Sequence, residues 1–109
     1  MAHPPFATGQ VITIFRNRLR PDGVDEYGPT ADEMSRLART MPGYVDHKSF
    51  TADDGERVTV VTFADAESQA GWRRHVEHRA AQRRGREAFY AEYSLQVGLC
   101  TTAHTFTST

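Results

Sequence analysis

Apolar and polar residues alternate along the first predicted element, which covers residues 10–19. A period of two is typical of a β-strand. One face of this strand carries Val11, Thr13, Phe15 and Asn17. From Val24 onward, apolar residues instead recur at steps of three and four as far as Met41, which predicts an amphipathic helix ended by Pro42 and Gly43.

The rest of the chain continues in the same way. Residues 44–51 and 57–63 predict two strands that a hairpin turn at residues 52–55 joins. Asp65 can cap a second helix, which breaks near His75 and then continues to Tyr90. A last strand is predicted from Tyr93 to about Phe106, weakened at Gly98.

The order strand, helix, strand, strand, helix, strand predicts an α+β fold of the ferredoxin-like βαββαβ type, with two helices on one face of an antiparallel sheet. The strands are apolar on both faces, as Val60 and Val61 show, and a chain of 109 residues has no third layer to offer. We therefore predict a homodimer packed sheet to sheet. Residues 10–106 are expected to form a single domain, with a flexible N-terminus at residues 1–9 and a tail at residues 107–109.

Composition excludes several classes of protein. The net charge is −1, which does not indicate a general nucleic-acid binder, and no apolar run approaches a membrane span. The single cysteine, Cys100, excludes a disulfide framework within one chain. The N-terminus lacks the basic start and apolar segment of a secretory signal. We therefore expect a soluble cytoplasmic protein with no nucleic-acid or membrane partner.

Positive charge is concentrated between residues 72 and 87, where six arginines stand against two glutamates. This pattern is consistent with steering of an anionic ligand, with a complementary subunit contact, or with solvated helix faces. Arg79 and Arg86 could pair with an anionic substrate or with acids of the first helix.

A few residues are candidates for chemistry. His75 and His78 share a helical face, so either could act as a general base, although both could instead cap the helix break. Trp72 could stack on an aromatic ligand or pack in the core. Asn17 is polar late in an apolar strand face and could hydrogen-bond a substrate oxygen, or could mark the point where the strand reaches solvent. Tyr90 and Tyr93 could donate hydroxyls to substrate or pack at a helix-to-strand corner.

Several stretches of the sequence resemble a known family. They are residues 15–21 (Phe-Arg-Asn-Arg-Leu-Arg-Pro), residues 41–44 (Met-Pro-Gly-Tyr), residues 54–58 (Asp-Gly-Glu-Arg-Val) and the block 72–90, which begins Trp-Arg-Arg-His. Together they are similar to the antibiotic biosynthesis monooxygenase superfamily over nearly the whole domain. The resemblance implies a dimeric α/β barrel, but it does not indicate a substrate, because the superfamily holds unrelated chemistries.

One branch of this superfamily contains cofactor-free oxygenases that convert polyketide phenols or hydroquinones into quinones. In that branch a tryptophan and an asparagine bind the phenol, and Trp72 and Asn17 match them. The resemblance thus adds Asn17 and Trp72 to His75 and His78 as catalytic candidates. The candidates for substrate binding are Phe15, Arg79, Gln82, Arg86, Tyr90 and Tyr93.

A second branch degrades heme, and its motif is an asparagine on the first strand, a tryptophan on the second helix, and a heme-ligating histidine ten residues after that tryptophan. Asn17 and Trp72 are similar to the first two. The position of the histidine is Gln82 here, a poor iron ligand beside imidazole. His75 or His78 could substitute, but one helical turn of displacement would move the iron by about 5 Å.

The leading hypothesis is therefore a cofactor-independent monooxygenase that oxidises a phenolic, polyketide-like small molecule with O2, with no metal and no prosthetic group. One alternative is a heme-binding or heme-degrading oxygenase that uses His75 or His78. Another is a non-redox cyclase or isomerase, or a ligand-binding barrel without catalysis.

Overall fold

The computed structural model describes residues 4–108, apart from the side chains of residues 24–26, 76 and 77. Its elements follow the predicted βαββαβ order, with the second helix in two parts, so the mixed α+β fold is confirmed. They are β1 (Val11–Leu19), a 3-10 turn η1 (Pro21–Gly23), α1 (Val24–Ala38), β2 (Tyr44–Thr51), β3 (Arg57–Phe63), α2 (Ala66–Arg74), α3 (Val76–Arg84), a π-helical turn η2 (Gly85–Phe89) and β4 (Tyr90–Leu99).

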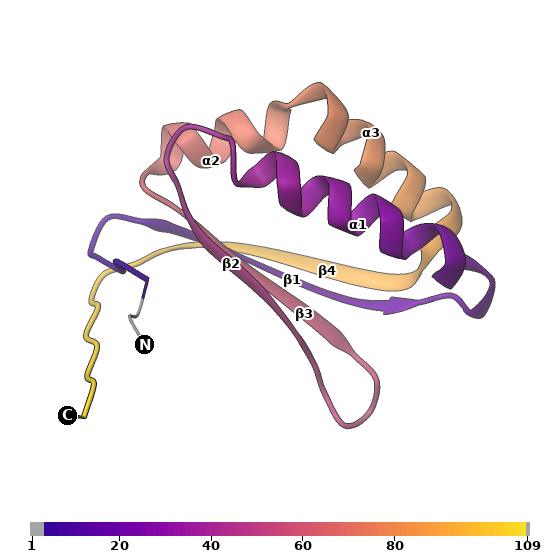
Figure 1. The fold of residues 1–109 in the computed structure, drawn as a ribbon, viewed down its shortest axis with the longest axis horizontal. Helices are drawn as coiled ribbons and strands as arrows, with labels where there is room; N and C mark the ends of the chain where they lie inside the picture. The colour runs from indigo at the N-terminus through magenta and orange to yellow at the C-terminus, as the bar shows by residue number, and fades with distance from the viewer. Residues whose placement is uncertain (1–3, 109) are drawn as a thin grey trace.

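The strands form one antiparallel sheet in the order β2-β3-β1-β4. All three α-helices lie on the same face of this sheet, as Figure 1 shows. In the register of β1, Asn17 lies opposite Arg57 of β3 and opposite Tyr93 of β4. Residues directly opposite each other share a face. Asn17, Arg57 and Tyr93 therefore form one row across the sheet.

This row belongs to the face that the helices cover. Thr13, on the same face of β1, lies near Gln69 of α2, with 3.5 Å between the Gln69 Nε2 and the Thr13 Oγ1 atoms. Phe63, opposite Val11, stacks against Trp72 of α2. We call this side the helix-facing side and the other side the open face.

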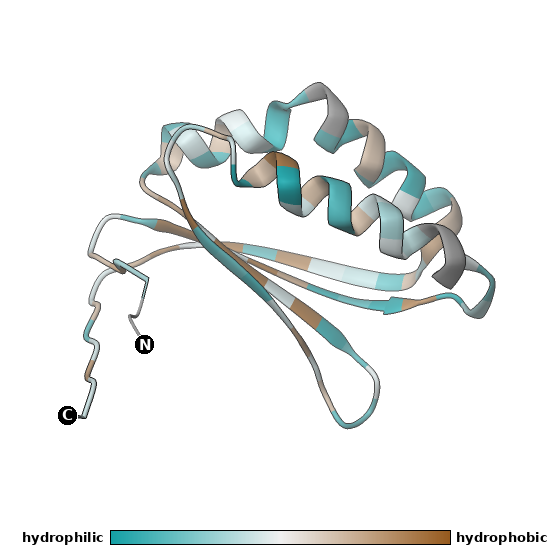
Figure 2. Ribbon diagram, in the orientation of Figure 1, coloured by the Kyte–Doolittle hydropathy of each residue, from teal (hydrophilic) through white to brown (hydrophobic). Residues whose placement is uncertain are grey.

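The buried core lies towards one end of the helix-facing side. Phe63 is fully buried and packs with Trp72 and Ala38, and partly buried apolar residues of α1, β2 and β3 surround them. Figure 2 shows the apolar positions along the strands and the hydrophilic positions along the helices. Within the described chain, no helix has the length and apolar character needed to cross a membrane.

Two predicted signals at the second helix are confirmed. Asp65 caps α2 in a capping box, because its Oδ1 accepts the backbone N–H of Ser68 at 2.8 Å while Ser68 bonds back to Asp65. The predicted break lies at His75, whose backbone is extended (φ −61°, ψ 133°) between α2 and α3.

Three predicted boundaries were wrong. The second helix was predicted to continue to Tyr90, but α3 ends at Arg84, a π-helical turn follows to Phe89, and Tyr90 begins β4. The first helix ends at Ala38 rather than Met41, because the backbone N–H groups of Thr40 and Met41 bond to carbonyls three residues earlier, as in a tight turn. The last strand covers Tyr90–Leu99 rather than residues 93–106. The partner strand β1 begins opposite Leu99, and the backbone N–H of Cys100 still bonds to the Gln10 carbonyl oxygen. Beyond Cys100, no strand of the described chain lies next to the last residues, so β4 ends there.

Candidate functional site

Asn17 is the most unusual polar residue on the helix-facing side. Its side chain is 1% exposed, and neither its Oδ1 nor its Nδ2 atom has a hydrogen-bond partner among the described residues. Buried amides are nearly always hydrogen-bonded, since an unsatisfied one costs about 1–3 kcal/mol. An amide left unpaired inside a fold is a candidate for binding a ligand.

Four aromatic rings gather around this end of β1, and we call them the aromatic cluster. They come from different elements and lie with neighbouring centroids 5.3–5.8 Å apart. Their residues are Phe15 of β1, Tyr27 of α1, and Tyr90 and Tyr93 of β4. Three of the residues predicted for substrate binding, Phe15, Tyr90 and Tyr93, thus lie together in this cluster.

A β-bulge brings the two β4 tyrosines to the same side. Residues three apart in a regular strand point to opposite faces. The register between β1 and β4 shifts between Arg18 and Leu19, so that Tyr90 lies opposite Leu19 while Tyr93 lies opposite Asn17. Both rings consequently face the helices.

Tyr90 is held as a neutral phenol. Burial, and after it the neighbouring Tyr27, raise the pKa of Tyr90 well above its usual value. Gly85 makes room for this ring, since a Cβ atom at position 85 would lie 2.5 Å from the Tyr90 Cε2 atom. Tyr90 can therefore donate a hydrogen bond but does not supply a base near neutral pH.

A second group of site residues lies at the α2–α3 break. The His78 ring stacks on Trp72 with centroids 3.9 Å apart and planes 17° from parallel. The His78 Nδ1 atom lies 3.0 Å from the carbonyl oxygen of Trp72. A carbonyl oxygen only accepts, so Nδ1 carries the proton, and in the neutral ring Nε2 keeps its lone pair.

The environment of His78 favours this neutral form. Burial lowers its pKa, and the charge of His75 lowers it further, while the bond to Trp72 opposes the change. His78 is therefore a base in the correct protonation state at neutral pH. His75 is half-buried at the break itself, where its backbone carbonyl accepts the N–H of Arg79.

The two groups lie at different ends of one surface. Thr13, beside α2, and Asn17 are four residues apart on β1, or about 13 Å at the rise of a strand. Between them the edge strand β4 presents Leu95 and Val97 on the helix-facing side, 48% and 46% exposed. The helix-facing side therefore carries polar groups at two ends, with exposed apolar side chains of β4 along its edge.

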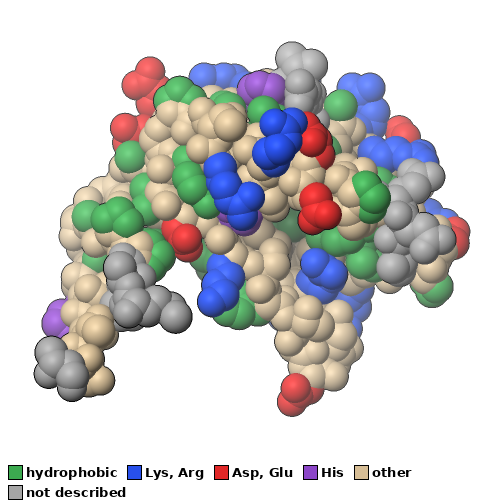
Figure 3. Space-filling model, in the orientation of Figure 1, with side chains coloured by type: hydrophobic (Ala, Val, Ile, Leu, Met, Phe, Trp, Pro, Cys, Tyr) green, Lys and Arg blue, Asp and Glu red, His purple; other side chains and the backbone are tan. Residues whose placement is uncertain are grey.

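The remaining predicted site residues lie apart from these groups. Arg79 and Arg86 are exposed, and no described carboxylate forms an ion pair with either one. Figure 3 shows basic and acidic side chains interspersed over the view that it presents. Gln82 is half-buried on α3. In the structure these arginines are therefore solvated.

Sequence reasoning missed two residues of the aromatic end. Tyr27 was assigned only to an apolar helix face, and Arg57 only to the start of a strand. The Arg57 guanidinium lies 4.9 Å above the Tyr27 ring. The signal that could have found Arg57 is its register opposite Asn17, which follows once the β2–β3 hairpin is placed against β1.

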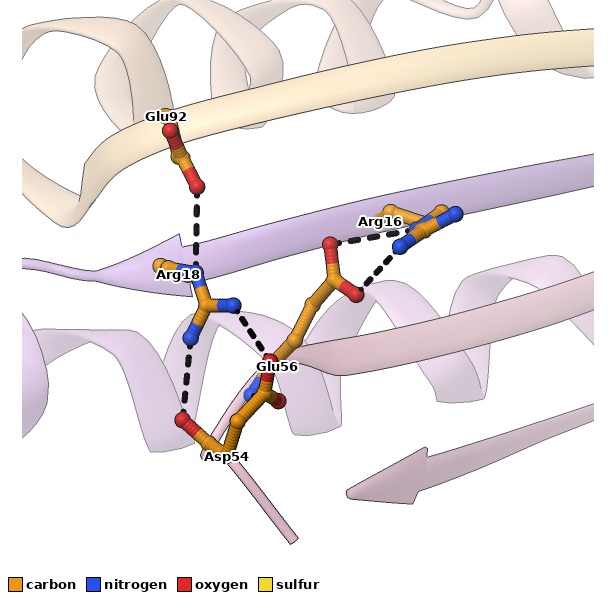
Figure 4. A network of polar contacts seen from close by, with 5 residues as sticks. All are labelled: Arg16, Arg18, Asp54, Glu56 and Glu92. Atoms are coloured by element: carbon orange, nitrogen blue, oxygen red, sulfur yellow. Dashed lines mark hydrogen bonds and ion pairs between the residues drawn. The ribbon is translucent and has the colours of Figure 1, made fainter. Parts of the chain in front are cut away.

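The open face carries a network of ion pairs, which Figure 4 shows. The Arg16 guanidinium binds both carboxylate oxygens of Glu56, at 2.6 and 3.1 Å. Arg18 bridges Asp54 at 2.8 Å and Glu92 at 3.0 Å. These arginines hold the pKa values of Glu56 and Asp54 below their usual range.

Two hollows lie along strands β1 and β4, and the first of them adjoins this network. The first measures about 260 Å³ and is lined by Arg16, Asn17, Glu56, Glu92, Tyr93 and Ser94. The second measures about 320 Å³ and is lined by Ile12, Ile14, Gln96, Val97, Gly98 and Leu99. Among the described residues, no three or more His, Cys, Asp or Glu side chains are grouped to hold a metal ion.

The sequence matches a family model. Residues 10–84 match the model described as antibiotic biosynthesis monooxygenase. The chain is also 37% identical over 94 residues to the uncharacterized protein YqjZ of Bacillus subtilis, a match that covers 86% of this chain and 78% of that protein.

Solved structures share the fold at low identity. Rv0793 from Mycobacterium tuberculosis superposes with a TM-score of 0.79 at 17% identity, covering 89% of this chain and all of that one. SnoaB, a cofactor-independent oxygenase from Streptomyces nogalater, superposes with a TM-score of 0.70 at 15% identity, covering 94% of this chain and all of that one.

Proposed function

The chain belongs to the antibiotic biosynthesis monooxygenase family, and we propose that it is a cofactor-independent oxygenase that oxidises a phenolic aromatic molecule with O2. The observation that carries the proposal is the buried amide of Asn17, unpaired and surrounded by aromatic rings. An amide can donate to one substrate oxygen and accept from another. The fold shared with SnoaB supports the same class of activity.

The proposed roles divide between the two ends of the helix-facing side. Asn17 orients an oxygen of the substrate, with the aromatic cluster against its rings. At the other end His78 accepts on Nε2 the proton that the substrate loses, because its Nδ1 already donates to the Trp72 carbonyl oxygen. Trp72 holds the plane of the imidazole by stacking and contributes to the wall that excludes water.

The reaction needs no external reductant when the substrate is an anthrone, the keto form of a polycyclic phenol. The ring methylene group of the anthrone and one molecule of O2 become a ring carbonyl group and one molecule of water, and the substrate supplies all four electrons. Loss of a proton to His78 gives an electron-rich anion that reduces O2 by one electron. The radicals join in a carbon–oxygen bond, the proton returns to the peroxide, and cleavage of the O–O bond releases water.

Oxygen uptake with 1,8-dihydroxyanthrone tests this proposal. We expect one O2 consumed per anthraquinone formed, above the rate with heat-denatured protein, and a large loss of rate in Asn17→Ala. Arg83→Gln, an exposed change on α3, is the matched control and should keep the rate. Turnover that continues without O2 would instead identify a cyclase or isomerase, and binding without any turnover would identify a ligand-binding barrel.

Heme binding is a second candidate function, and one observation favours it. Histidines that ligate a metal usually donate their other ring N–H to a carbonyl, as His78 does to Trp72. Heme, if bound, would supply oxygen activation through its iron, and His78 would be the residue that holds it, since position 82 carries a glutamine. A hemin titration followed at the Soret band tests it, since a saturable band that His78→Asn abolishes would support heme, and no saturable band would exclude it.

We also propose that the chain forms a homodimer through its open faces. Phe50, Ile14 and Val60 lie on this face, and Phe50 is 51% exposed. A second copy would cover these apolar side chains. The Arg16 and Arg18 network at one end of the face pairs its charges within the chain, so a second copy would meet no unpaired charge of these arginines there.

A further inference from the structure

Arg57 lies opposite Asn17, whose amide is unpaired, and no described carboxylate pairs with the charge of Arg57. The two residues are directly opposite in the β1–β3 register, so both side chains lie on the helix-facing side. The Arg57 guanidinium lies 4.9 Å above the Tyr27 ring and is half-buried. None of the ion pairs among the described side chains includes Arg57.

Two other arginines of the sheet have carboxylate partners, as is usual for an arginine with a structural role. Arg16 and Arg18, on the open face of the neighbouring strand, each bind carboxylates through two nitrogens. Arg57 has no such partner although it is less exposed than Arg16. The Tyr27 ring offsets part of the hydration that Arg57 loses, but it supplies no oxygen for the guanidinium N–H groups to bind. The half-buried Arg57 and the buried, unpaired amide of Asn17 thus lie opposite each other, and both can bind an oxygen.

We propose that Arg57 and Asn17 form an oxyanion subsite that recognises an ionised oxygen on a planar aromatic ligand. The guanidinium supplies charge and a planar set of donors, and the Asn17 amide supplies one further donor. The rings of the aromatic cluster provide flat apolar surfaces for the rest of the ligand. The inference rests on the proposed function and deepens it by naming the ionised state of the bound substrate.

The entrance to this subsite lies at the β4 edge of the sheet. Asn17 is closed to solvent, whereas Tyr93 beside it on the edge strand is 44% exposed. A ligand therefore reaches the amide by displacing the Tyr93 ring. The Tyr90 ring lies against Tyr93, with centroids 5.8 Å apart, and burial keeps its phenol protonated by raising its pKa.

Binding of a matched pair of stable quinones tests the subsite without turnover. The probes are 2-hydroxy-1,4-naphthoquinone, which is ionised at neutral pH, and its 2-methoxy analogue, which cannot ionise. Quenching of Trp72, the only tryptophan of the chain, reports binding of both. We expect wild type to bind the hydroxyquinone at least 10-fold more tightly than the methoxyquinone.

Arg57→Gln should remove this preference and leave the affinity for the methoxyquinone within about twofold. Arg57→Lys keeps the charge but not the planar donors, and should retain part of the preference. Arg83→Gln should retain all of it. An unchanged preference in Arg57→Gln, or no preference in wild type, would overturn the proposal and would mean that Arg57 only packs on Tyr27.

The outcome can be separated from that of the proposed function. Wild type that consumes O2 with 1,8-dihydroxyanthrone but shows no quinone preference retains the oxygenase function and loses the subsite. If wild type prefers the hydroxyquinone, Arg57→Gln abolishes that preference and wild type consumes no O2, the subsite is supported and the oxygenase function is rejected. Circular dichroism of Arg57→Gln establishes that the variant is folded before either comparison.

Discussion

The ring of His78 stacks on Trp72 at a centroid distance of 3.9 Å while its Nδ1 atom donates to the Trp72 carbonyl oxygen at 3.0 Å. The two residues belong to different helices, and the extended backbone of His75 between them makes the contact possible. The same histidine thus secures the end of α2 and presents an unprotonated Nε2. His78 therefore has a structural role through Nδ1 and a chemical role through Nε2, and variants that keep the first role but not the second distinguish them.

His78→Asn should lower turnover by about 100-fold or more, because an asparagine amide can still donate to the Trp72 carbonyl but supplies no base. In wild type, the rate should fall as the pH drops and His78 becomes protonated. Its pKa lies below the ordinary histidine value of about 6.5, so the acid limb should lie below that pH. The measurement is the pH profile of oxygen uptake.

His75→Asn is the matched control for this profile, since His75 lies at the same helix break and the substitution keeps its backbone N–H bond to the Trp72 carbonyl oxygen, at 3.1 Å. The acid limb should persist in His75→Asn and disappear in His78→Asn. The loss of rate in His78→Asn should be smallest at high pH, where the substrate ionises without a base from the protein. An acid limb that follows His75 instead would reassign the base.

Asn17→Leu should stabilise the fold and abolish activity. Leucine removes a buried amide without partners, which is worth about 1–3 kcal/mol, while the ligand loses its hydrogen-bonding residue. Gln10→Leu is the control, because it should lower the free energy of unfolding where Asn17→Leu should raise it. Gln10 is also buried, but its side chain bonds to the Ala7 N–H at 3.0 Å and to the Pro5 carbonyl at 2.9 Å.

Urea unfolding measures both changes. We expect the free energy of unfolding to rise in Asn17→Leu and to fall in Gln10→Leu by about 1–2 kcal/mol, because each lost bond contributes about 1 kcal/mol. A destabilised Asn17→Leu would show that the amide is satisfied in solution and would remove the main support for a ligand at this position.

The elements of this fold could be predicted from sequence because they depend on local patterns. The period of two in β1 placed Asn17 on the same face as Phe15, and the Asp65 cap and the His75 break were visible as single residues. The end of the last strand was not visible, because it is fixed by where β1 begins. Strand length there depends on a partner rather than on propensity.

The site was predicted only in part for a similar reason. Asn17 and Trp72 stood out as residue types, whereas Arg57 became a site residue only through its register with Asn17. Tyr90 and Tyr93 share a face only because of a bulge, which leaves no mark in an alternating pattern. Pairing between distant segments, and not residue identity, determines which side chains meet.

Gly43→Ala should destabilise the protein by about 2 kcal/mol or more, because two costs add at this position. Gly43 has a positive φ of 79°, which alanine adopts only with strain, and a Cβ atom there would overlap the Ser68 Cβ and Oγ atoms. The added group would therefore also disturb the capping box of α2. Thermal unfolding followed by circular dichroism measures the loss.

The matched control is Gly28→Ala in α1, where an added Cβ meets no atom within 4 Å. Alanine is the better helix former, so this variant should gain roughly 0.5–1 kcal/mol. Equal effects of the two substitutions would contradict the distinction drawn between a strained turn and an open helix position.

Val60→Lys should convert the proposed homodimer into a monomer. Val60 lies on the open face opposite Ile14 of β1 and Lys48 of β2, so the variant places a second positive charge where two sheets would meet. Glu67→Lys, on the exposed first turn of α2, changes charge away from that face and should leave the assembly intact. Sedimentation equilibrium distinguishes the two, since wild type and Glu67→Lys should show twice the chain mass and Val60→Lys the mass of one chain. A wild-type protein with the mass of one chain would contradict the proposed homodimer.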